Sequence, residues 1–245
     1  MRCNMHNKKR KMTLNFILSG IFFALFLVLT VMLKTVDVTD CGPNGTAIGL
    51  SSINSFFFDI FGQNDLFYTI TELIGYFAIL VALVMCFLGL IQLIKRKNLF
   101  KVSHRILCLA GVYALVVIAF IAFEIFIINY RPILVDGEIE ASYPSTHTML
   151  VACILMTAIP ELCSLFKDKK GLKIATVTVC SVLTAITAIG RLLAGVHWFT
   201  DVCAALLISG AIIFLYYALI TLISLKKKLP AESSTSDEAN QGINI

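Results

Sequence analysis

Five polar side chains in the second half of the chain have the types and the spacing that phosphate chemistry uses. They are Arg131, His147, Arg191, His197 and Asp201. His197 and Asp201 are four residues apart, so on a helix they share one face, where the carboxylate can accept from one ring nitrogen and leave the other free to attack. His147 can then protonate the leaving oxygen, and guanidinium groups suit the oxygens of a phosphate. The set predicts a phosphate-cleaving site.

Membrane helices must position these residues, because the composition is that of a membrane protein. Of the 245 residues, 58% are hydrophobic and 14% are charged, whereas in a soluble domain about a quarter are charged. Six apolar stretches are each long enough to cross a bilayer, which takes about 20 residues. They span residues 13–33, 67–94, 106–129, 147–166, 172–190 and 201–225. We therefore predict an all-α polytopic membrane protein with six transmembrane helices in one bundle.

The chain divides into three predicted parts. A basic N-terminus, residues 1–12, precedes a six-helix membrane domain, residues 13–225, in which residues 124–201 form the motif region. Residues 226–245 are polar and predicted to form a disordered cytoplasmic tail. The first apolar stretch follows a basic start but shows no small-residue cleavage site, so we interpret it as a retained helix rather than a removed signal peptide.

The basic residues predict the direction in which each helix crosses the membrane. Of the 20 lysines and arginines, 17 lie in the N-terminus, the second and fourth connections and the C-terminal tail. The positive-inside rule places both termini in the cytoplasm and the odd-numbered connections outside. Basic residues in short runs between apolar stretches also argue against a nucleic-acid-binding face, despite the net charge of +5. We expect an integral protein of the plasma membrane whose site faces outward.

Two helix N-termini should help the side chains to bind phosphate. The fourth and sixth predicted helices run inward, so their N-termini point outward and offer free backbone N–H groups with a partial positive charge. Residues 143–147 open the fourth helix, with Ser145 or Thr146 as the N-cap, and residues 197–201 open the sixth. We expect both helix ends and the two arginines to converge on one outward pocket.

Three short motifs resemble a known signature. They read Arg131-Pro132, then Pro144-Ser145-Thr146-His147, then Arg191 with five residues to His197 and three more to Asp201. In order, spacing and placement they resemble the three-part signature of the type-2 phosphatidic acid phosphatase superfamily, which includes the lipid phosphate phosphatases. The six-helix layout extends this resemblance over nearly the whole chain.

The resemblance implies a role for each matching residue. His197 would be the nucleophile that forms a phosphohistidine, and Asp201 would orient it. His147 would be the general acid and then the base that activates water. No metal or other cofactor would be needed. The phosphoryl oxygens would be bound by Arg131, Arg191 and Ser145.

The sequence departs from the family signature at three positions. Thr146 stands in place of a glycine, Gly190 in place of a serine, and Glu124 in place of a lysine. Glu124 lies seven residues before Arg131, which is two turns of a helix, so we expect it about 10 Å deeper in the membrane. An acid there is costly unless it is paired with Arg131 or uncharged. The change of charge predicts weaker recognition of a highly charged substrate.

The leading hypothesis is a metal-independent phosphohydrolase that acts on a lipid phosphate monoester or a (prenyl) diphosphate at the outer leaflet. Its expected partners are that lipid and the bilayer. We expect it to bind no nucleic acid. Two alternatives stay open. One is a lipid phosphotransferase, in which another acceptor takes the phosphoryl group from His197. The other is a catalytically weak lipid-phosphate-binding relative, for which Glu124 is the best argument. The scarcity of charges deep in the helices disfavours a transporter.

Two segments outside the motifs carry further expectations. Glu72 lies near the outer end of the second predicted helix, where we interpret it as an interhelical hydrogen-bonding residue. The segment Ser-Phe-Phe-Phe-Asp-Ile-Phe, residues 55–61, lies in the first outward connection. Its pattern favours a short amphipathic helix in the plane of the membrane interface.

Overall fold

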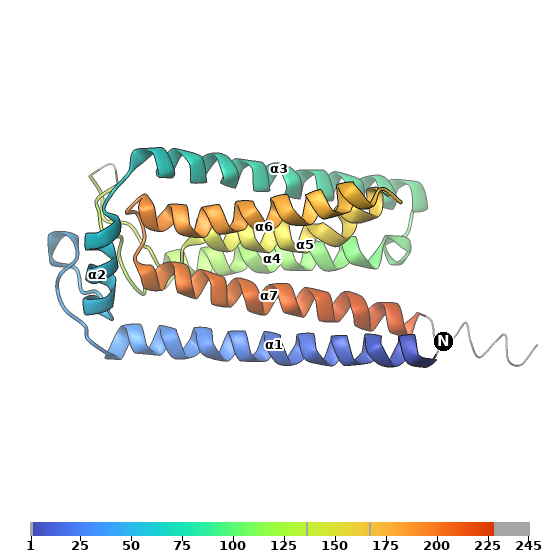
Figure 1. The fold of residues 1–245 in the computed structure, drawn as a ribbon, viewed down its shortest axis with the longest axis horizontal. Coiled ribbons are helices and arrows are strands. Elements are labelled where there is room, and N and C mark those ends of the chain that lie inside the picture. The colour runs from blue at the N-terminus through green and yellow to red at the C-terminus, as the bar shows by residue number, and fades with distance from the viewer. Residues whose placement is uncertain (1, 136, 167, 228–245) are drawn as a thin grey trace, which may run out of the picture.

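Long apolar helices make up nearly all of the computed structural model, which describes residues 2–135, 137–166 and 168–227. The described residues form seven α-helices and no strands, and six of these helices are long and apolar enough to cross a membrane. Those six lie side by side in one bundle, and a short helix, α2, lies across one end (Figure 1). The bounds are α1 Arg2–Thr35, α2 Ser51–Phe61, α3 Asp65–Arg96, α4 His104–Ile125, α5 Thr146–Leu165, α6 Lys170–Leu193 and α7 Phe199–Lys226.

These bounds confirm the all-α, six-span architecture, with one correction. The predicted stretch 106–129 extends beyond α4, which ends at Ile125 with Phe126 as its C-cap. The chain then continues in an irregular connection to α5, in which Asn129 is buried and accepts from the backbone N–H of Gly49. The end of α4 at Ile125 could not be predicted from apolar composition alone, because the residues after it are also apolar. Residues 228–245, most of the tail predicted to be disordered, lie outside the described residues.

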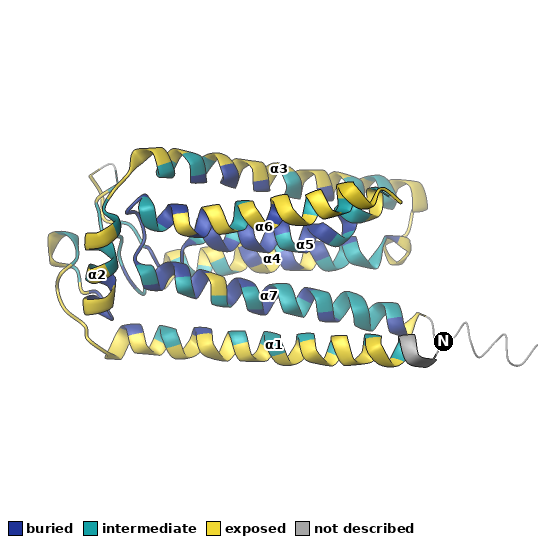
Figure 2. Ribbon diagram, viewed as in Figure 1, coloured by how far each residue is buried: buried dark blue, intermediate teal, exposed yellow. Residues whose placement is uncertain are grey.

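The core of the bundle surrounds α5. In its most apolar stretch 61% of the residues are buried, compared with 11% in α1 and in α3. Figure 2 shows the same contrast between the buried α5 and the exposed outer surfaces of α1 and α3. The helix α5 packs against α3, α4, α6 and α7, whereas α1 packs along α7. The exposed side chains of the outer helices are large and apolar, as expected of surfaces that face lipid.

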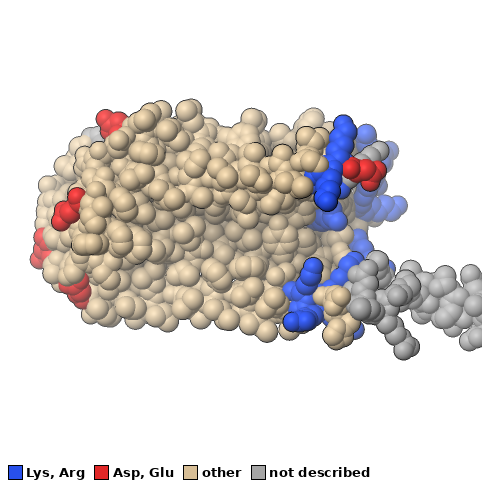
Figure 3. All heavy atoms as spheres, viewed as in Figure 1, with Lys and Arg blue, Asp and Glu red and all other residues tan. Residues whose placement is uncertain are grey.

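The charged residues separate along the length of the bundle. Lysines and arginines gather at the end where α1 begins, beside a few acidic atoms, whereas the charged residues visible at the opposite end are acidic (Figure 3). The basic connection between α3 and α4 lies at the first end, together with the start of α6. This distribution is the one on which the predicted topology rests. Which end faces the cytoplasm stays a prediction.

The predicted interfacial segment is a helix, and it holds the start of α7. Asn54 of α2 is fully buried, and its Oδ1 accepts from the backbone N–H of Thr200, at 3.2 Å. Phe57 stacks on Phe199 with the ring centroids 4.0 Å apart. A free N–H at the first turn of α7 is thereby satisfied by a side chain from α2. Trp198, which precedes this turn, also packs on α2, with its ring centroid 5.6 Å from that of Phe58.

Candidate active site

The connections at one end of the bundle bring together the residues that the sequence singles out. His147 lies in the first turn of α5, and Arg191 lies in the last turn of α6. His197 precedes α7, and Arg131 lies in the connection between α4 and α5. The backbone N–H of Ser145 donates to the carbonyl oxygen of Asp201 at 3.1 Å, which joins the starts of α5 and α7 directly. The structure therefore places all five side chains at one end of the bundle.

A backbone carbonyl is the nearest hydrogen-bond partner of His197. Its Nδ1 lies 3.0 Å from the carbonyl oxygen of Ser142 and 3.8 Å from Oδ2 of Asp201. The Asp201 oxygen instead accepts from the backbone N–H of Trp198 at 2.9 Å. The expectation that Asp201 accepts from the His197 ring is thus corrected, because the Ser142 carbonyl is the acceptor that fixes the tautomer. Asp201 instead stabilises the turn that carries the imidazole. His197 precedes α7, which begins at Phe199, so the pair does not share a helix face.

The other ring nitrogen of His197 is left free for chemistry. Because a carbonyl oxygen only accepts, Nδ1 carries the proton and Nε2 has its lone pair. Nε2 is buried and has no hydrogen-bond partner among the described residues. Burial, followed by the charges of Arg191 and Arg131, holds the pKa of His197 well below its usual value of 6.5. A neutral imidazole with a free lone pair is the form that can attack phosphorus.

His147 and Arg191 contact each other and share a third partner. Nη2 of Arg191 lies 3.1 Å from Nδ1 of His147. Glu72 of α3 places Oε1 at 3.1 Å from Nη1 of Arg191 and at 3.0 Å from Nε2 of His147. Arg191 is fully buried, and its guanidinium also lies over the ring of Tyr68. Glu72 joins three helices, which confirms its interpretation as an interhelical hydrogen-bonding residue.

Glu124 lies apart from these contacts, which corrects the expected placement under Arg131. Helix α4 ends at Ile125, so the two residues do not lie on one helix two turns apart. Arg131 pairs instead with Glu140, at 3.2 Å between Nε and Oε2. Glu124 is exposed on the outside of the bundle. The acids that pair with the two arginines are therefore Glu72 and Glu140 rather than Glu124.

The first turn of α5 begins where the motif predicts, but the N-cap side chain makes no capping hydrogen bond. Ser145 is the N-cap residue, and Thr146 is the first residue of the helix. The Ser145 side chain is fully buried, with Oγ at 3.0 Å from Oγ1 of Thr148. Thr146 is half-buried and lines a cavity together with His147. Backbone N–H groups at such a helix start suit an anion.

Gly190 allows α6 to approach α3 closely. A Cβ atom at this position would lie 2.6 Å from Cγ2 of Thr71, well inside van der Waals contact. Thr71 in turn accepts from Nη1 of Arg191 at 3.3 Å. The serine of the family signature would therefore not fit here without a shift of α6 against α3. Gly190 is explained by helix packing next to the site.

This packing gives a testable expectation for stability. Gly190→Ser should lower the midpoint of thermal unfolding, because overpacking of a tight contact costs about 1–3 kcal/mol. Thr71→Ser removes the methyl group that clashes and keeps the hydroxyl that faces Arg191. The double variant Gly190→Ser/Thr71→Ser should recover most of the loss. Thermal melts of the purified parent, Gly190→Ser and the double variant in one detergent check this, and a double variant no more stable than Gly190→Ser would contradict the packing explanation.

Comparison with known proteins places the motif region in a family. The family model described as the PAP2 superfamily matches residues 125–223, which contain all five residues. This segment is similar to the PAP2 superfamily over less than half of the chain. It includes α5, α6 and most of α7, together with the connection that carries Arg131. The resemblance predicted from the motifs is confirmed.

A solved structure shares the fold of the PAP2 segment and of the helices before it. It is titled the crystal structure of the first transmembrane PAP2 type phosphatidylglycerolphosphate phosphatase from Bacillus subtilis. The likeness has a TM-score of 0.58 with 19% sequence identity, over 81% of this chain and 94% of that one. At this identity the likeness establishes the fold. A search of curated proteins found no match.

Three features of the site carry no motif signal. Glu72 and Asn54 lie outside the PAP2 segment, on α3 and α2. The contribution of Ser142 is a backbone carbonyl, which any residue type would supply. One feature of the sequence did indicate a role for Glu72, since an acid near the end of an apolar stretch is uncommon. Asn54 had none, because a polar residue in an amphipathic segment is ordinarily solvated.

Proposed function

We propose that this protein is a membrane phosphohydrolase that removes phosphate from a lipid phosphate monoester or a (prenyl) diphosphate at the extracytoplasmic face. The observation that carries the proposal is the state of His197: a buried imidazole whose Nδ1–H is held by a carbonyl and whose Nε2 has no partner among the described residues. The match of residues 125–223 to the PAP2 superfamily and the shared fold support phosphatase-type function. A binding protein would not need an imidazole held in this way.

The proposed reaction has two steps. Nε2 of His197 attacks phosphorus, the bond from phosphorus to the leaving oxygen breaks, and His147 gives that oxygen a proton. Water then attacks the phosphohistidine while His147 takes a proton from it, which releases phosphate and restores both imidazoles. Arg191 and Arg131 balance the charge on the phosphoryl oxygens, so the proposal includes no metal. Ser145 and the N–H groups at the start of α5 complete the phosphate contacts.

A cavity next to His147 supports a substrate that carries a lipid chain. It has a volume of about 170 Å³ and is bordered by Glu72 and His147 at one side. The rest of its lining comes from α3, α4 and α5, chiefly Gly75, Tyr76, Ile79, Val116, Phe120, Met149 and Leu150. An apolar space that meets the polar site suits a headgroup in the site with its chain beside it. A water-soluble phosphate ester would leave that space without a matching group.

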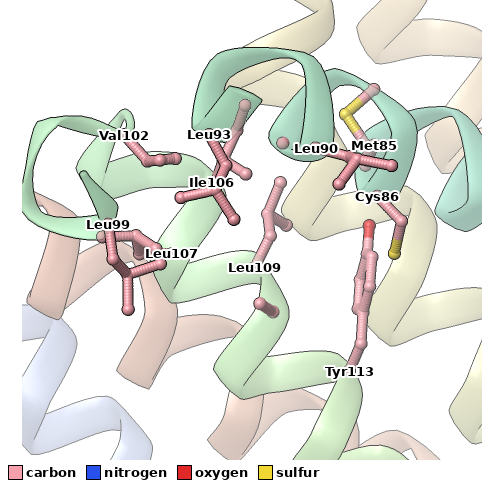
Figure 4. A pocket seen from close by; sticks show the side chains of 12 residues that line it. Met85, Cys86, Leu90, Leu93, Leu99, Val102, Ile106, Leu107, Leu109 and Tyr113 are labelled. Carbon is pink, nitrogen blue, oxygen red and sulfur yellow. The ribbon is translucent and has the colours of Figure 1, made fainter. Parts of the chain in front are cut away.

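A second cavity lies farther along the bundle, toward its basic end. It is about 290 Å³ in volume, lies between α3 and α4, and is lined by Met85, Leu90, Leu109 and Tyr113 among others (Figure 4). None of the residues assigned to the reaction borders it. The cavity beside His147 is the one that supports our proposal for the substrate, because it borders a residue assigned to the reaction.

The test is phosphate release by the purified full-length protein and by His197→Ala. The panel contains phosphatidic acid, phosphatidylglycerol phosphate, a prenyl diphosphate and a sphingoid phosphate, each in mixed micelles. The parent should release phosphate from at least one of them, and His197→Ala should not. Equal release by both proteins would overturn the proposal. Labelled donor with and without candidate acceptor alcohols separates hydrolysis from phosphotransfer, since only phosphotransfer yields a labelled acceptor.

The low pKa of His197 predicts activity on the acid side of neutrality. The attacking form is neutral, and its fraction falls as the pH drops through the pKa of His197. Because burial and the two arginines hold that pKa well below 6.5, the acid limb of kcat/KM that belongs to His197 should lie below pH 6.5. The profile is measured with two substrates whose phosphates differ in their second pKa. The limb that belongs to the enzyme lies at the same pH for both substrates. An enzyme limb above pH 6.5 would contradict the neutral buried imidazole.

A further inference from the structure

Glu72 lies in the site although none of the three motifs contains it. One carboxylate oxygen, Oε1, lies 3.1 Å from Nη1 of Arg191 and 3.0 Å from Nε2 of His147. The side chain of Arg191 is 1% exposed and that of Glu72 is 21% exposed, so water screens the pair little. The contacts of Oε1 with a guanidinium and an imidazole are those that an oxygen of a phosphoryl group would make.

We propose that Glu72 is a resident anion of the site. It holds Arg191 and His147 between turnovers, and the phosphoryl group must displace it from Arg191 in order to bind. This inference rests on the proposed function, because it takes Arg191 as a phosphate ligand and His147 as the proton carrier. Glu72 is a positioning residue, since it acts on the substrate through these two side chains.

The burial of Arg191 explains why an anion is needed there. A guanidinium that is fully enclosed by α3, α5 and α6 is strongly unfavourable without a counter-charge. Glu72 supplies that charge when no phosphate does, and so keeps the guanidinium in its binding position. Arg131 is paired in a similar way with Glu140, but the Glu140 side chain is 43% exposed, so solvent weakens that pair. The buried pair is the one expected to compete with substrate.

The same contacts fix the proton on His147. An arginine only donates, so Nδ1 of His147 accepts from Arg191, and the ring proton lies on Nε2 and is donated to Glu72. When Arg191 turns to phosphoryl oxygens, Nδ1 is released while Glu72 still holds Nε2–H. Nδ1 then takes up a proton from solvent, with the Glu72 carboxylate as counter-charge to the imidazolium, and this Nδ1–H is the proton given to the leaving oxygen. Glu72 thereby sets the orientation of the imidazole as well as its tautomer.

These two effects predict opposite changes in binding and turnover. Without the charge of Glu72, an anion meets Arg191 with no competitor and should bind more tightly. Without that charge, the protonated ring of His147 loses its counter-ion, so turnover should fall even where a glutamine oxygen still accepts from Nε2–H. A residue that only supports the fold would weaken both properties together, so the opposed changes distinguish the two roles.

The experiment compares the full-length parent with Glu72→Gln in detergent micelles. In Glu72→Gln the inhibition constant of inorganic phosphate should fall about tenfold, since a nearby like charge is removed from a partly buried site. Its kcat should fall about tenfold or more, part of the roughly 10²–10⁴-fold that general acid–base catalysis contributes. Glu161→Gln is the matched control, because Glu161 is a buried acid of α5 whose partner is Arg105, at 4.0 Å. It should change neither quantity.

An inhibition constant that is unchanged or raised in Glu72→Gln would overturn the inference. If Glu72→Gln does not fold, Glu72→Asp retracts the carboxylate by one methylene and should shift phosphate binding in the same direction. Calorimetric titration with inorganic phosphate measures that affinity without turnover. It therefore tests the role of Glu72 independently of whether the protein is a phosphatase. The proposed function fails separately, when the parent and His197→Ala release phosphate equally.

Discussion

His147→Ala should release phosphate from a lipid phosphate at least about a hundredfold more slowly than the parent, because general acid–base catalysis contributes about 10²–10⁴-fold. An alkoxide leaves slowly when no acid protonates it. A nitrophenyl phosphate needs no such help, so its first step should proceed in the variant. The second step still lacks the base that activates water. His147→Ala should therefore retain a phosphoryl group on His197 when it is given the nitrophenyl ester.

The retained group can be measured directly. After a brief incubation with labelled nitrophenyl phosphate, the protein is quenched in alkali and its bound label is counted. His147→Ala should carry label, and the double variant His147→Ala/His197→Ala should carry none. The variant should remain folded, because Arg191 and Glu72 still pair at 3.1 Å when the imidazole is removed. If both substrates are slowed alike and no label is retained, His147 does not act in the second step.

The elements of the site were predictable because they depend on hydropathy and on local spacing. The predicted starts of the fourth and sixth helices fall within two residues of the observed α5 and α7, which begin at Thr146 and Phe199. Both starts follow from a change from polar to apolar residues at a helix end. The convergence of His147 and His197 was predictable for the same reason. Two helices that begin at the same end of the bundle, α5 and α7, place their N-termini at one face.

The partners of these residues were not predictable, because they depend on tertiary contacts. Residues 126–129 are mostly apolar, yet they leave the helix, and Asn129 packs against the connection after α1. Hydropathy does not distinguish such a segment from another helical turn. As a result, the expected placement of Glu124 two turns below Arg131 was wrong, and Arg131 pairs with Glu140 instead. The acid that enters the site, Glu72, comes from α3, far from the motifs in sequence.

Arg191→Lys should lose at least about a hundredfold in kcat/KM, a loss comparable to that of a donor to a transition-state oxyanion. Arg191 directs Nη1 to Glu72 and Thr71 and Nη2 to His147, and its buried Nε has no partner among the described residues. A lysine ammonium is a point charge at the end of a flexible chain and cannot reproduce this planar fork. Arg131→Lys should lose less, because that side chain is partly exposed and pairs with an exposed acid.

Arg191→Met separates the structural part of this role from the catalytic part. It leaves the carboxylate of Glu72 without its cation, which should destabilise the protein by about 3–5 kcal/mol. Adding Glu72→Gln removes the unpaired charge, so the double variant should recover much of the stability and none of the activity. Thermal melts and phosphate release from the same preparations test both statements. A double variant no more stable than Arg191→Met would mean that the ion pair is not what holds α3 and α6 together at the site.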